Sequence, residues 1–339
     1  MRRGRRSTSK IVTIEDVARV AGVSITTVSR VINKLPSVKG GNRDKVLEAI
    51  KELKFQPSIF AQRLATGKSN VIALVIPRYE GVFYSFYALE LIRGIGTLCA
   101  VLKLDLLLHL TESRSPLNLK GEGGIIFADI IGNLQQLEEA KSAGVPCVVI
   151  NHYFKEADVT SISVDNFGGA QNAVNYLISL GHKRIAHITG DLVTQAAADR
   201  FEGYKKALEK NKLEANPHYI FKTDYSRGQA RSAAEDMLAM HNPPTAVFCG
   251  SDAMALEVMA VAKELGKKIP GDLSVVGFDD NPSGLYGSVA LTTVRQPLIK
   301  MAEESVKELN RLINNKGAPA KKIILPTELV IRDSCRPLK

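Results

Sequence analysis

From residue 70 onward, short apolar runs alternate with amphipathic segments, and this alternation constrains the fold more than any other feature. The runs that predict strands lie at 70–77, 104–110, 123–128, 145–150, 161–165, 183–189, 245–252 and 273–280. Apolar residues at helical spacing fall between them, for example at 167–181, 199–211, 228–240 and 253–266. Strands that alternate with helices form parallel sheets with both faces covered. A segment of about 270 residues exceeds one small sheet, so we predict two α/β lobes.

The excess positive charge is confined to the first fifth of the chain. Of 45 Lys and Arg and 35 Asp and Glu, residues 1–68 hold 15 and 5, which leaves 30 and 30 for residues 69–339. A basic tail supplies only part of this excess, because Arg30, Arg43 and Lys51 lie inside helical patterns. A compact basic module ahead of a neutral body predicts a polyanionic partner, most simply nucleic acid.

Residues 13–33 have the pattern of two short helices joined by a tight turn. Thr13 followed by Asp16 predicts a capped helix start, Gly22 ends that helix, and Ser24 caps the next one. This is the helix-turn-helix arrangement, whose second helix presents its first residues to base edges in the major groove.

The outward face of the second helix suits DNA. Ile25 fits a thymine methyl group, Thr26 and Ser29 donate or accept hydrogen bonds, and Arg30 reaches guanine or phosphate. The alternative is an ordinary helical hairpin with a solvated polar face. A third apolar stripe follows up to Pro57, and we expect its helix to start late, with Asn42 as the cap, because two glycines precede it.

These residues resemble the lactose/galactose-repressor family of transcription regulators. The resemblance rests on TIEDVARVAGVSITTVSRVIN, on RDKVLEAIKEL and on the spacing of Pro57, Ala61 and Leu64, and it extends from about Val12 to Arg336. It implies an all-α helix-turn-helix head at 1–57, a hinge at 58–69 and a two-lobed body of the periplasmic-binding-protein type I fold, with parallel sheets, at 70–339.

In that family the hinge forms a helix on DNA, and a leucine enters the minor groove and kinks the duplex. The resemblance gives this role to Leu64; the alternative is a leucine that packs the linker against the body. The DNA contacts that we predict are Thr13, Ile14, Ser24, Ile25, Thr26, Thr27, Ser29, Arg30, Asn33, Asn42 and Leu64.

A small-molecule effector is expected between the lobes, where the strands end. A polyol calls for carboxylates, arginine and an aromatic wall, and the resemblance implies that Arg200 and Asp279 hold the effector. Asp165 and Asp252 precede helices and serve equally well as caps, and Asp279 as a turn residue. The predicted effector contacts are Tyr79, Phe83, Asp165, Arg200, Tyr225, Ser251, Asp252 and Asp279.

One segment departs from the family pattern. Only His109 to Glu122 separates two strands that should run parallel, and a crossover with its helix needs about a dozen residues. Pro116 and Gly121 fall within it. We predict that the second helix of the first lobe is missing or reduced to a turn. The alternative consequences are an open sheet face, a less stable lobe or a non-functional effector site.

The sequence therefore predicts a cytoplasmic, homodimeric, sequence-specific transcription regulator, most simply a repressor. Its partners are double-stranded operator DNA and an effector, a sugar before a nucleobase. A solute-binding protein of a transport system shares the body fold but has no use for a basic head. An enzyme is disfavoured because nucleotide-binding, zinc-protease and hydrolase motifs are absent, and no metal or cofactor is expected. No run reaches the ~20 apolar residues that cross a bilayer.

Overall fold

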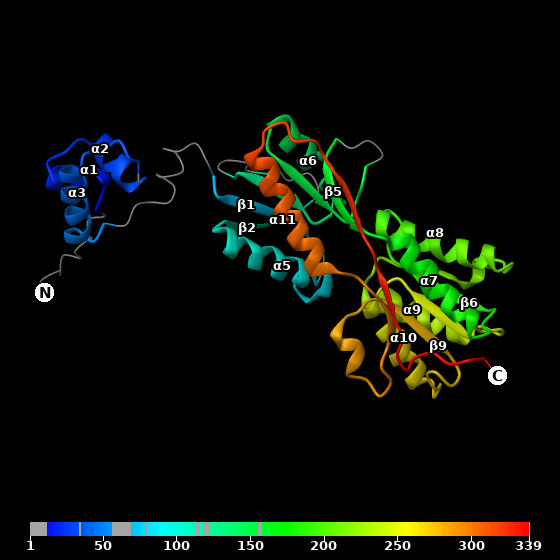
Figure 1. Ribbon diagram of the computed structural model, residues 1–339. Coiled ribbons are helices and arrows are strands. Elements are labelled where there is room, and N and C mark those ends of the chain that lie inside the picture. Colours follow the sequence, from blue (N-terminus) through cyan, green and yellow to red (C-terminus); the bar gives the residue numbers. More distant parts are fainter. Residues whose placement is uncertain are drawn as a thin grey trace, which may run out of the picture. The chain divides into compact units, whose positions relative to one another are not determined.

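The computed structural model describes residues 12–33, 35–55, 69–78, 81–112, 116–117, 122–129, 131–154 and 158–338. The chain divides into two compact units, the head at Met1–Asn70 and the body at Val71–Lys339, and each is considered by itself (Figure 1). Pro57 and Leu64, with the rest of the predicted hinge up to residue 68, lie outside the described residues.

The head is built from three helices around one small core. They are α1 (Ile14–Ala21), α2 (Ile25–Ile32) and α3 (Gly40–Glu52). Val17, Val28 and Val46, one from each helix, are fully buried at its centre. Gly22 ends α1 in the left-handed conformation, with φ 64°, which costs a residue with a Cβ atom about 1–2 kcal/mol.

Helix α3 begins earlier than the sequence predicts. The prediction placed the cap at Asn42, but the helix starts at Gly40, and Lys39 precedes it without a side-chain cap. The carbonyl of Lys39 accepts hydrogen bonds from the backbone N–H groups of Asn42 and Arg43, at 3.1 and 3.2 Å. The glycine penalty applies to helix interiors, whereas these two glycines occupy the first turn, where their N–H groups need no partner within the helix.

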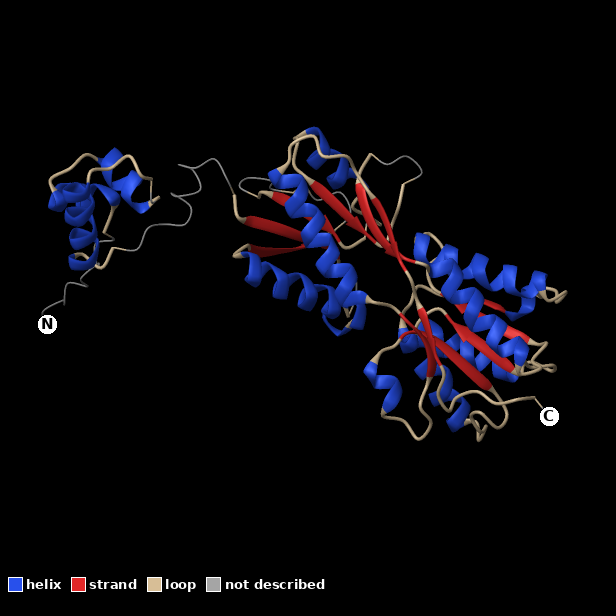
Figure 2. Ribbon diagram, in the orientation of Figure 1, coloured by secondary structure: helices blue, strands red, loops and turns tan. Residues whose placement is uncertain are grey.

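The first lobe of the body is a six-stranded parallel sheet with helices on both faces (Figure 2). The strand order is β11-β5-β4-β3-β1-β2. The strands are β1 (Val71–Pro77), β2 (Asp105–Thr111), β3 (Gly124–Phe127), β4 (Cys147–Ile150), β5 (Thr160–Val164) and β11 (Lys322–Leu325). Helices α5 (Phe86–Leu102) and α11 (Leu298–Asn314) pack on one face and α6 (Leu134–Ser142) on the other. A 3-10 turn, η1 (Val82–Tyr84), precedes α5.

The second lobe repeats this plan with a second six-stranded sheet. Its order is β12-β10-β9-β8-β6-β7, and only the β10–β12 pair is antiparallel. The strands are β6 (Ile185–Thr189), β7 (Ile220–Lys222), β8 (Ala246–Cys249), β9 (Ser274–Asp279), β10 (Thr292–Arg295) and β12 (Glu328–Val330). The helices are α7 (Asn166–Ser179), α8 (Gln195–Lys210), α9 (Arg227–Ala239) and α10 (Asp252–Glu264). Two 3-10 turns, η2 (Pro217–Tyr219) and η3 (Pro282–Leu285), complete it.

Three segments connect the lobes. The chain crosses from β5 into α7, from β10 back into α11, and from β11 into β12. At one crossing the backbone N–H of Asp165 donates to the carbonyl of Leu325 over 2.9 Å, so two of these segments are hydrogen-bonded to each other.

Only part of the shortened crossover of the first lobe lies within the described residues, so the missing helix stays a prediction. Between β2 and β3 the described positions 112, 116–117 and 122–123 are not helical, and Leu117 packs against the sheet where a helix would otherwise lie. The edge strand β2 is left exposed, with Leu107, Leu108 and Leu110 between 36% and 40% accessible.

Candidate functional site

Helix α2 starts at a cap that fixes two predicted DNA contacts. The Ser24 Oγ atom accepts from the Thr27 backbone N–H over 3.2 Å and lies 2.9 Å from the Thr27 Oγ1 atom. Because Ser24 is in extended conformation, the chain enters the helix at a defined angle. This start places the next side chains on the outer face.

The outer face of α2 presents the chemistry that the sequence predicts. Ile25 is 47% exposed, and Thr26 and Arg30 are also exposed. Ser29 and Asn33 are half-buried, and the Asn33 Nδ2 atom donates to the Ser29 Oγ atom over 3.4 Å. The apolar methyl groups, the hydroxyl and the guanidinium therefore share one accessible surface, which we call the α2 face (Ile25, Thr26, Arg30).

The other predicted DNA contacts lie outside the α2 face. Thr13 caps α1 reciprocally with Asp16, which leaves its hydroxyl engaged in the capping box. The side chain of Ile14 is partly buried against the head core, and its contact with DNA stays a prediction. Asn42 is exposed in the first turn of α3, and Leu64 is outside the described residues.

The second lobe carries a polar cluster where its strands end, formed by Arg200, Tyr225, Ser251, Asp279 and Gln296. Arg200, from α8, is 4% exposed, and its Nη1 atom donates to the Gly250 carbonyl over 2.6 Å. Its guanidinium carbon lies 3.8 Å from the centre of the Phe278 ring. The charge is thus fixed in place, as a preorganised anchor requires.

A neighbouring amide also orients Arg200. The Nε atom of Arg200 donates to the Asn166 Oδ1 atom over 2.8 Å. Asn166 is the first residue of α7 and is 2% exposed. Sequence reasoning missed Asn166, because its contact is with a residue 34 positions later in the chain.

Asp279 ends β9 with a φ of 140°, a region that side chains rarely adopt. Its Oδ1 atom accepts from the Gln296 Nε2 atom over 2.6 Å. Burial raises the pKa of Asp279 above its usual value, although Arg200 and Gln296 favour the charged form. Gln296 is 6% exposed, and sequence reasoning missed it because it follows β10, far from the motif that holds Asp279.

Tyr225 closes the cluster from the loop before α9. It has a left-handed backbone with φ 69°, and its ring lies so close to Gly190 that a Cβ atom there would meet the ring at 1.9 Å. Burial raises the pKa of the Tyr225 phenol, and the charges of Asp279 and of Asp129 in the first lobe add to the rise. Acidic side chains of both lobes therefore lie close enough to the phenol to affect its ionisation.

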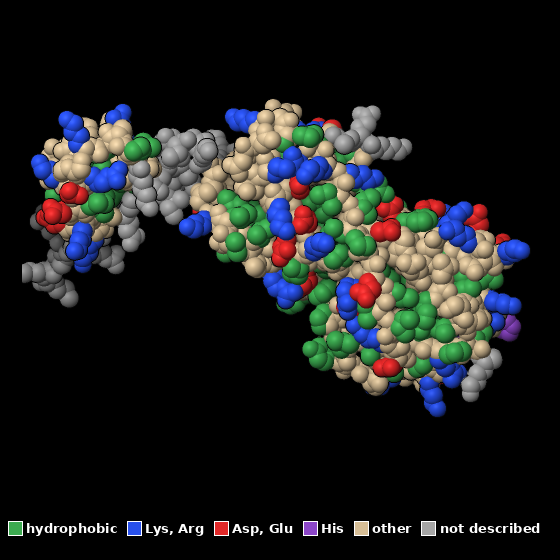
Figure 3. Space-filling view, in the orientation of Figure 1, with side chains coloured by type: hydrophobic (Ala, Val, Ile, Leu, Met, Phe, Trp, Pro, Cys, Tyr) green, Lys and Arg blue, Asp and Glu red, His purple; other side chains and the backbone are tan. Residues whose placement is uncertain are grey.

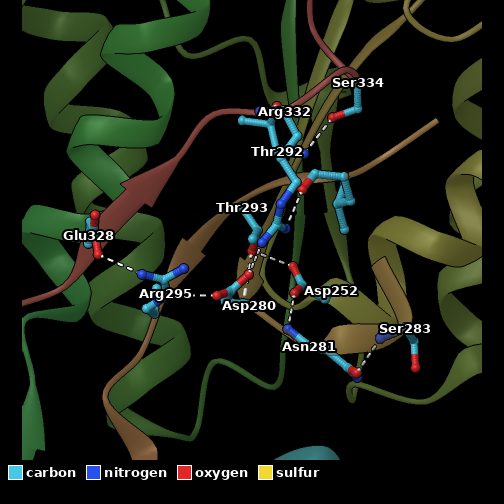
Figure 4. Close-up of polar contacts among 11 residues, drawn as sticks. Asp252, Asp280, Asn281, Ser283, Thr292, Thr293, Arg295, Glu328, Arg332 and Ser334 are labelled. Atoms are coloured by element: carbon cyan, nitrogen blue, oxygen red, sulfur yellow. Dashed lines mark hydrogen bonds and ion pairs between the residues drawn. The ribbon is translucent and has the colours of Figure 1, made fainter. Parts of the chain in front are cut away.

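Asp252 corrects the sequence prediction of an effector contact. Its side chain is fully buried, and its carboxylate accepts from the Thr293 Oγ1 atom over 2.5 Å and from the Asn281 backbone N–H over 2.7 Å (Figure 4). Burial and the charge of Asp279 raise the pKa of Asp252. The residue supports the turn behind Asp279, which is a structural role.

Ser251 is 8% exposed, and its Oγ atom accepts from the Met254 N–H as the cap of α10. Asp165 is exposed and caps α7 through the Gly168 N–H at 2.8 Å, the alternative that the sequence left open. Phe83 is 54% exposed on η1. Tyr79 lies outside the described residues.

A chain of ion pairs lies beside this turn (Figure 4). Asp280 binds both Arg295, at 2.7 Å, and Arg332, and Arg295 also binds Glu328 at 3.0 Å. Burial opposes ionisation of Asp280, but hydrogen bonds from the two arginines keep its pKa below the usual value. These pairs tie β12, which follows one lobe crossing, to β10, which precedes another.

No group of three or more His, Cys, Asp or Glu side chains within the described ranges could hold a metal ion. None of the helices in those ranges has the length and hydropathy needed to cross a bilayer. His187 is fully buried beside Phe248, whose carbonyl its Nδ1 atom contacts at 2.8 Å.

Two families match the two parts of the chain. Residues 13–58 match the family described as "Bacterial regulatory proteins, lacI family", and residues 174–335 match the "Periplasmic binding protein-like domain". The first match contains α1, α2 and α3, and the second contains the whole polar cluster.

Full-length relatives show the same combination. Catabolite control protein A from Priestia megaterium is 34% identical over 96% of this chain and 99% of its own length. The HTH-type transcriptional repressor PurR from Vibrio cholerae is 32% identical over 96% and 98%. A crystal structure of the Lac repressor dimer bound to operator and the anti-inducer ONPF has a TM-score of 0.82 and 27% identity, over 96% of this chain and all of that one.

These relatives are DNA-binding regulators, so the solute-binding and enzyme alternatives are set aside. The head, the two-lobed body with parallel sheets and the near-complete coverage of regulators in both directions lead to one assignment. The chain belongs to the lacI family of bacterial transcription regulators.

Proposed function

We propose that this protein is a homodimeric repressor of the cytoplasm that binds a near-palindromic operator through α2 and answers to a small molecule. The observation that carries the proposal is the α2 face, on which Ile25, Thr26 and Arg30 are accessible together. A helix-turn-helix dimer reads two half-sites, one with each recognition helix. The basic head supplies the electrostatic part of the affinity.

The effector site is the polar cluster, and a sugar is the favoured ligand. Asp279 offers a carboxylate and Arg200 a fixed guanidinium to hydroxyl groups, and Tyr225 offers an aromatic wall. A cellobiose complex of the regulator CelR, 28% identical with a TM-score of 0.73, supports this choice. A nucleobase is the second choice, and Tyr79, Phe83, Asp165 and Ser251 remain proposed contacts.

Homodimer formation is supported by apolar surface on the first lobe. Leu108 and Leu110 are exposed on the edge strand β2, and Leu89 and Val101 are 46% and 70% exposed on α5. Figure 3 shows hydrophobic side chains on this part of the body. Clustered apolar residues on an unpaired strand edge are typical of a surface that a partner covers.

Two experiments test the proposal. Gel-shift titration of the full chain should show tight binding to palindromic duplexes enriched from a random pool and weak binding to unselected duplexes. Equal affinity for both would rule out a sequence-specific regulator.

Thermal-shift screening against sugars and nucleobases should give a ligand whose stabilisation is lost in Asp279→Asn, because the amide removes the charge without changing the shape.

A further inference from the structure

A tyrosine of the first lobe is bound by two side chains of the second. Tyr153 follows β4, and Gln195 is the first residue of α8. The Gln195 Oε1 atom accepts from the Tyr153 backbone N–H over 2.7 Å, and its Nε2 atom donates to the Tyr153 carbonyl over 3.2 Å. One side-chain amide thus satisfies both main-chain groups of a residue in the opposite lobe.

The ring of Tyr153 extends the same contact. Its hydroxyl donates to the Asp199 Oδ2 atom over 3.2 Å, one turn further along α8. The Lys322 Nζ atom, on β11 of the first lobe, lies 3.6 Å from the centre of the ring. Burial raises the pKa of both Tyr153 and Asp199, while Lys322 opposes the rise at Asp199.

We propose that Tyr153, Gln195 and Asp199 form an interlobe latch that holds the lobes in the arrangement of this structure. The latch hydrogen bonds exist only while the lobes stay in this arrangement, so they favour it over any more open one. They would be lost together if the lobes moved apart at the three connecting segments.

The latch bears on the response to an effector because the latch residues Gln195 and Asp199 lie on α8, the helix that also carries Arg200. Asp199 adjoins Arg200, the buried arginine of the polar cluster, on the same helix. Holding the start of α8 to the first lobe therefore fixes the position of Arg200 relative to that lobe. This consequence rests on the proposed effector role of Arg200, whereas the latch itself is tested without any ligand.

Hydrogen–deuterium exchange of the full chain tests the latch. In Gln195→Ala we expect exchange to become about tenfold faster, as the loss of two hydrogen bonds predicts, at Tyr153 and also at the lobe connections near residues 164–166 and 325–328. The Asp165 N–H bond to Leu325 ends the β5–β11 pair where both segments leave the first lobe, so exchange of this amide reports on motion at that crossing. Tyr153→Phe, which removes only the bond to Asp199, should give a smaller increase at the same places.

The matched control is Gln135→Ala. Gln135 is an exposed glutamine of α6 whose amide donates to Glu139 within its own lobe, so its loss should leave the connections unchanged. Faster exchange confined to Tyr153, with the connections as in the parent, would overturn the latch. If Gln195→Ala fails to fold, Tyr153→Phe decides: connections that exchange as in the parent overturn the proposal.

Discussion

Two buried carboxyl groups, those of Asp279 and of Asp252 behind it, determine how the charge of the polar cluster changes with pH. Asp252 and Asp279 lie close enough for the Asp252 N–H to donate to the Asp279 carboxylate, and burial raises the pKa of each. The cluster therefore combines a permanently charged Arg200 with acidic groups that hold protons to higher pH than free aspartates do. Stability and ligand recognition both depend on this balance.

Asp252→Asn should make stability less dependent on pH. A carboxyl group whose folded pKa exceeds its unfolded value of 3.8 makes the folded state bind more protons, so the unfolding free energy falls as pH rises from 3.8 towards the folded pKa. Asparagine does not ionise, and it can hold both partners if its Oδ1 atom accepts from the Asn281 N–H and its Nδ2 atom donates to the Thr293 hydroxyl. Urea unfolding between pH 5 and 8 should show a flatter profile in the variant.

The control for this prediction is Asp236→Asn on α9, where the carboxyl group is exposed. Its profile should run parallel to that of the parent. A parallel profile in Asp252→Asn as well would show that Asp252 ionises in the folded protein as freely as in the unfolded chain.

Arg30→Ala should weaken DNA binding nearly uniformly across sequences. Arg30 lies in the last turn of α2, whereas base contacts come from the first residues of a recognition helix. We expect the slope of log affinity against log salt to fall by about 1, the value for one lost phosphate contact. Lys267→Ala, an exposed change in the body, should leave the slope unchanged. A change in sequence preference with an unchanged slope would instead make Arg30 a base reader.

Sequence reasoning identified several site residues but could not assign all their roles. The family motifs lead to Arg200 and Asp279, and the structure places both in one cluster. Sequence reasoning could not decide whether Asp252 contacts the effector or supports the turn behind Asp279, because the answer depends on Thr293, 41 positions later. Gln296 was missed for the same reason, since its partner is set by the sheet and not by local pattern.

At the scale of elements, capping residues predicted the head better than propensity did. Thr13 and Ser24 begin α1 and α2 where the sequence expects them. The start of α3 was wrong by three residues because a cost that belongs to helix interiors was applied to a first turn. The missing crossover helix stays a prediction from chain length, which limits what fits between β2 and β3.

Gly40→Ala should stabilise α3. Gly40 has a helical backbone, and a Cβ atom there would meet nothing within 4 Å. Removing the freedom of glycine in the unfolded chain is worth about 0.4–1 kcal/mol at such a site. Amide exchange in 40–52 of the full chain should slow. Gly22→Ala, at φ 64°, is the opposing control and should speed exchange in α1; no difference between the two would refute the backbone argument.

At the scale of the whole molecule, the positive charge and the exposed apolar surface lie on different parts of the chain. The net charge of +10 is carried by residues 1–68, while the neutral body exposes apolar residues on β2 and α5. The first property attracts DNA without regard to sequence, and we propose that the second joins two copies so that two heads are available together.

Leu108→Lys should weaken the dimer. A lysine on the exposed edge of β2 must lose its hydration when a second copy covers it, a cost that the leucine does not carry. Sedimentation velocity should show a shift towards monomer. Leu265→Lys, at a residue that is 54% exposed after α10, should leave the dimer intact. A dimer as stable as the parent in Leu108→Lys would place the interface elsewhere.

The most direct measurement is the affinity of the triple variant Ile25→Ala, Thr26→Val, Arg30→Ala for the palindrome that the parent selects. Because these exposed side chains support no core contact, the head should stay folded while specific affinity falls by about 10³-fold or more, to the level of random duplex. A folded variant that still distinguishes the palindrome from random DNA as well as the parent would contradict the assignment of α2 as the reading helix.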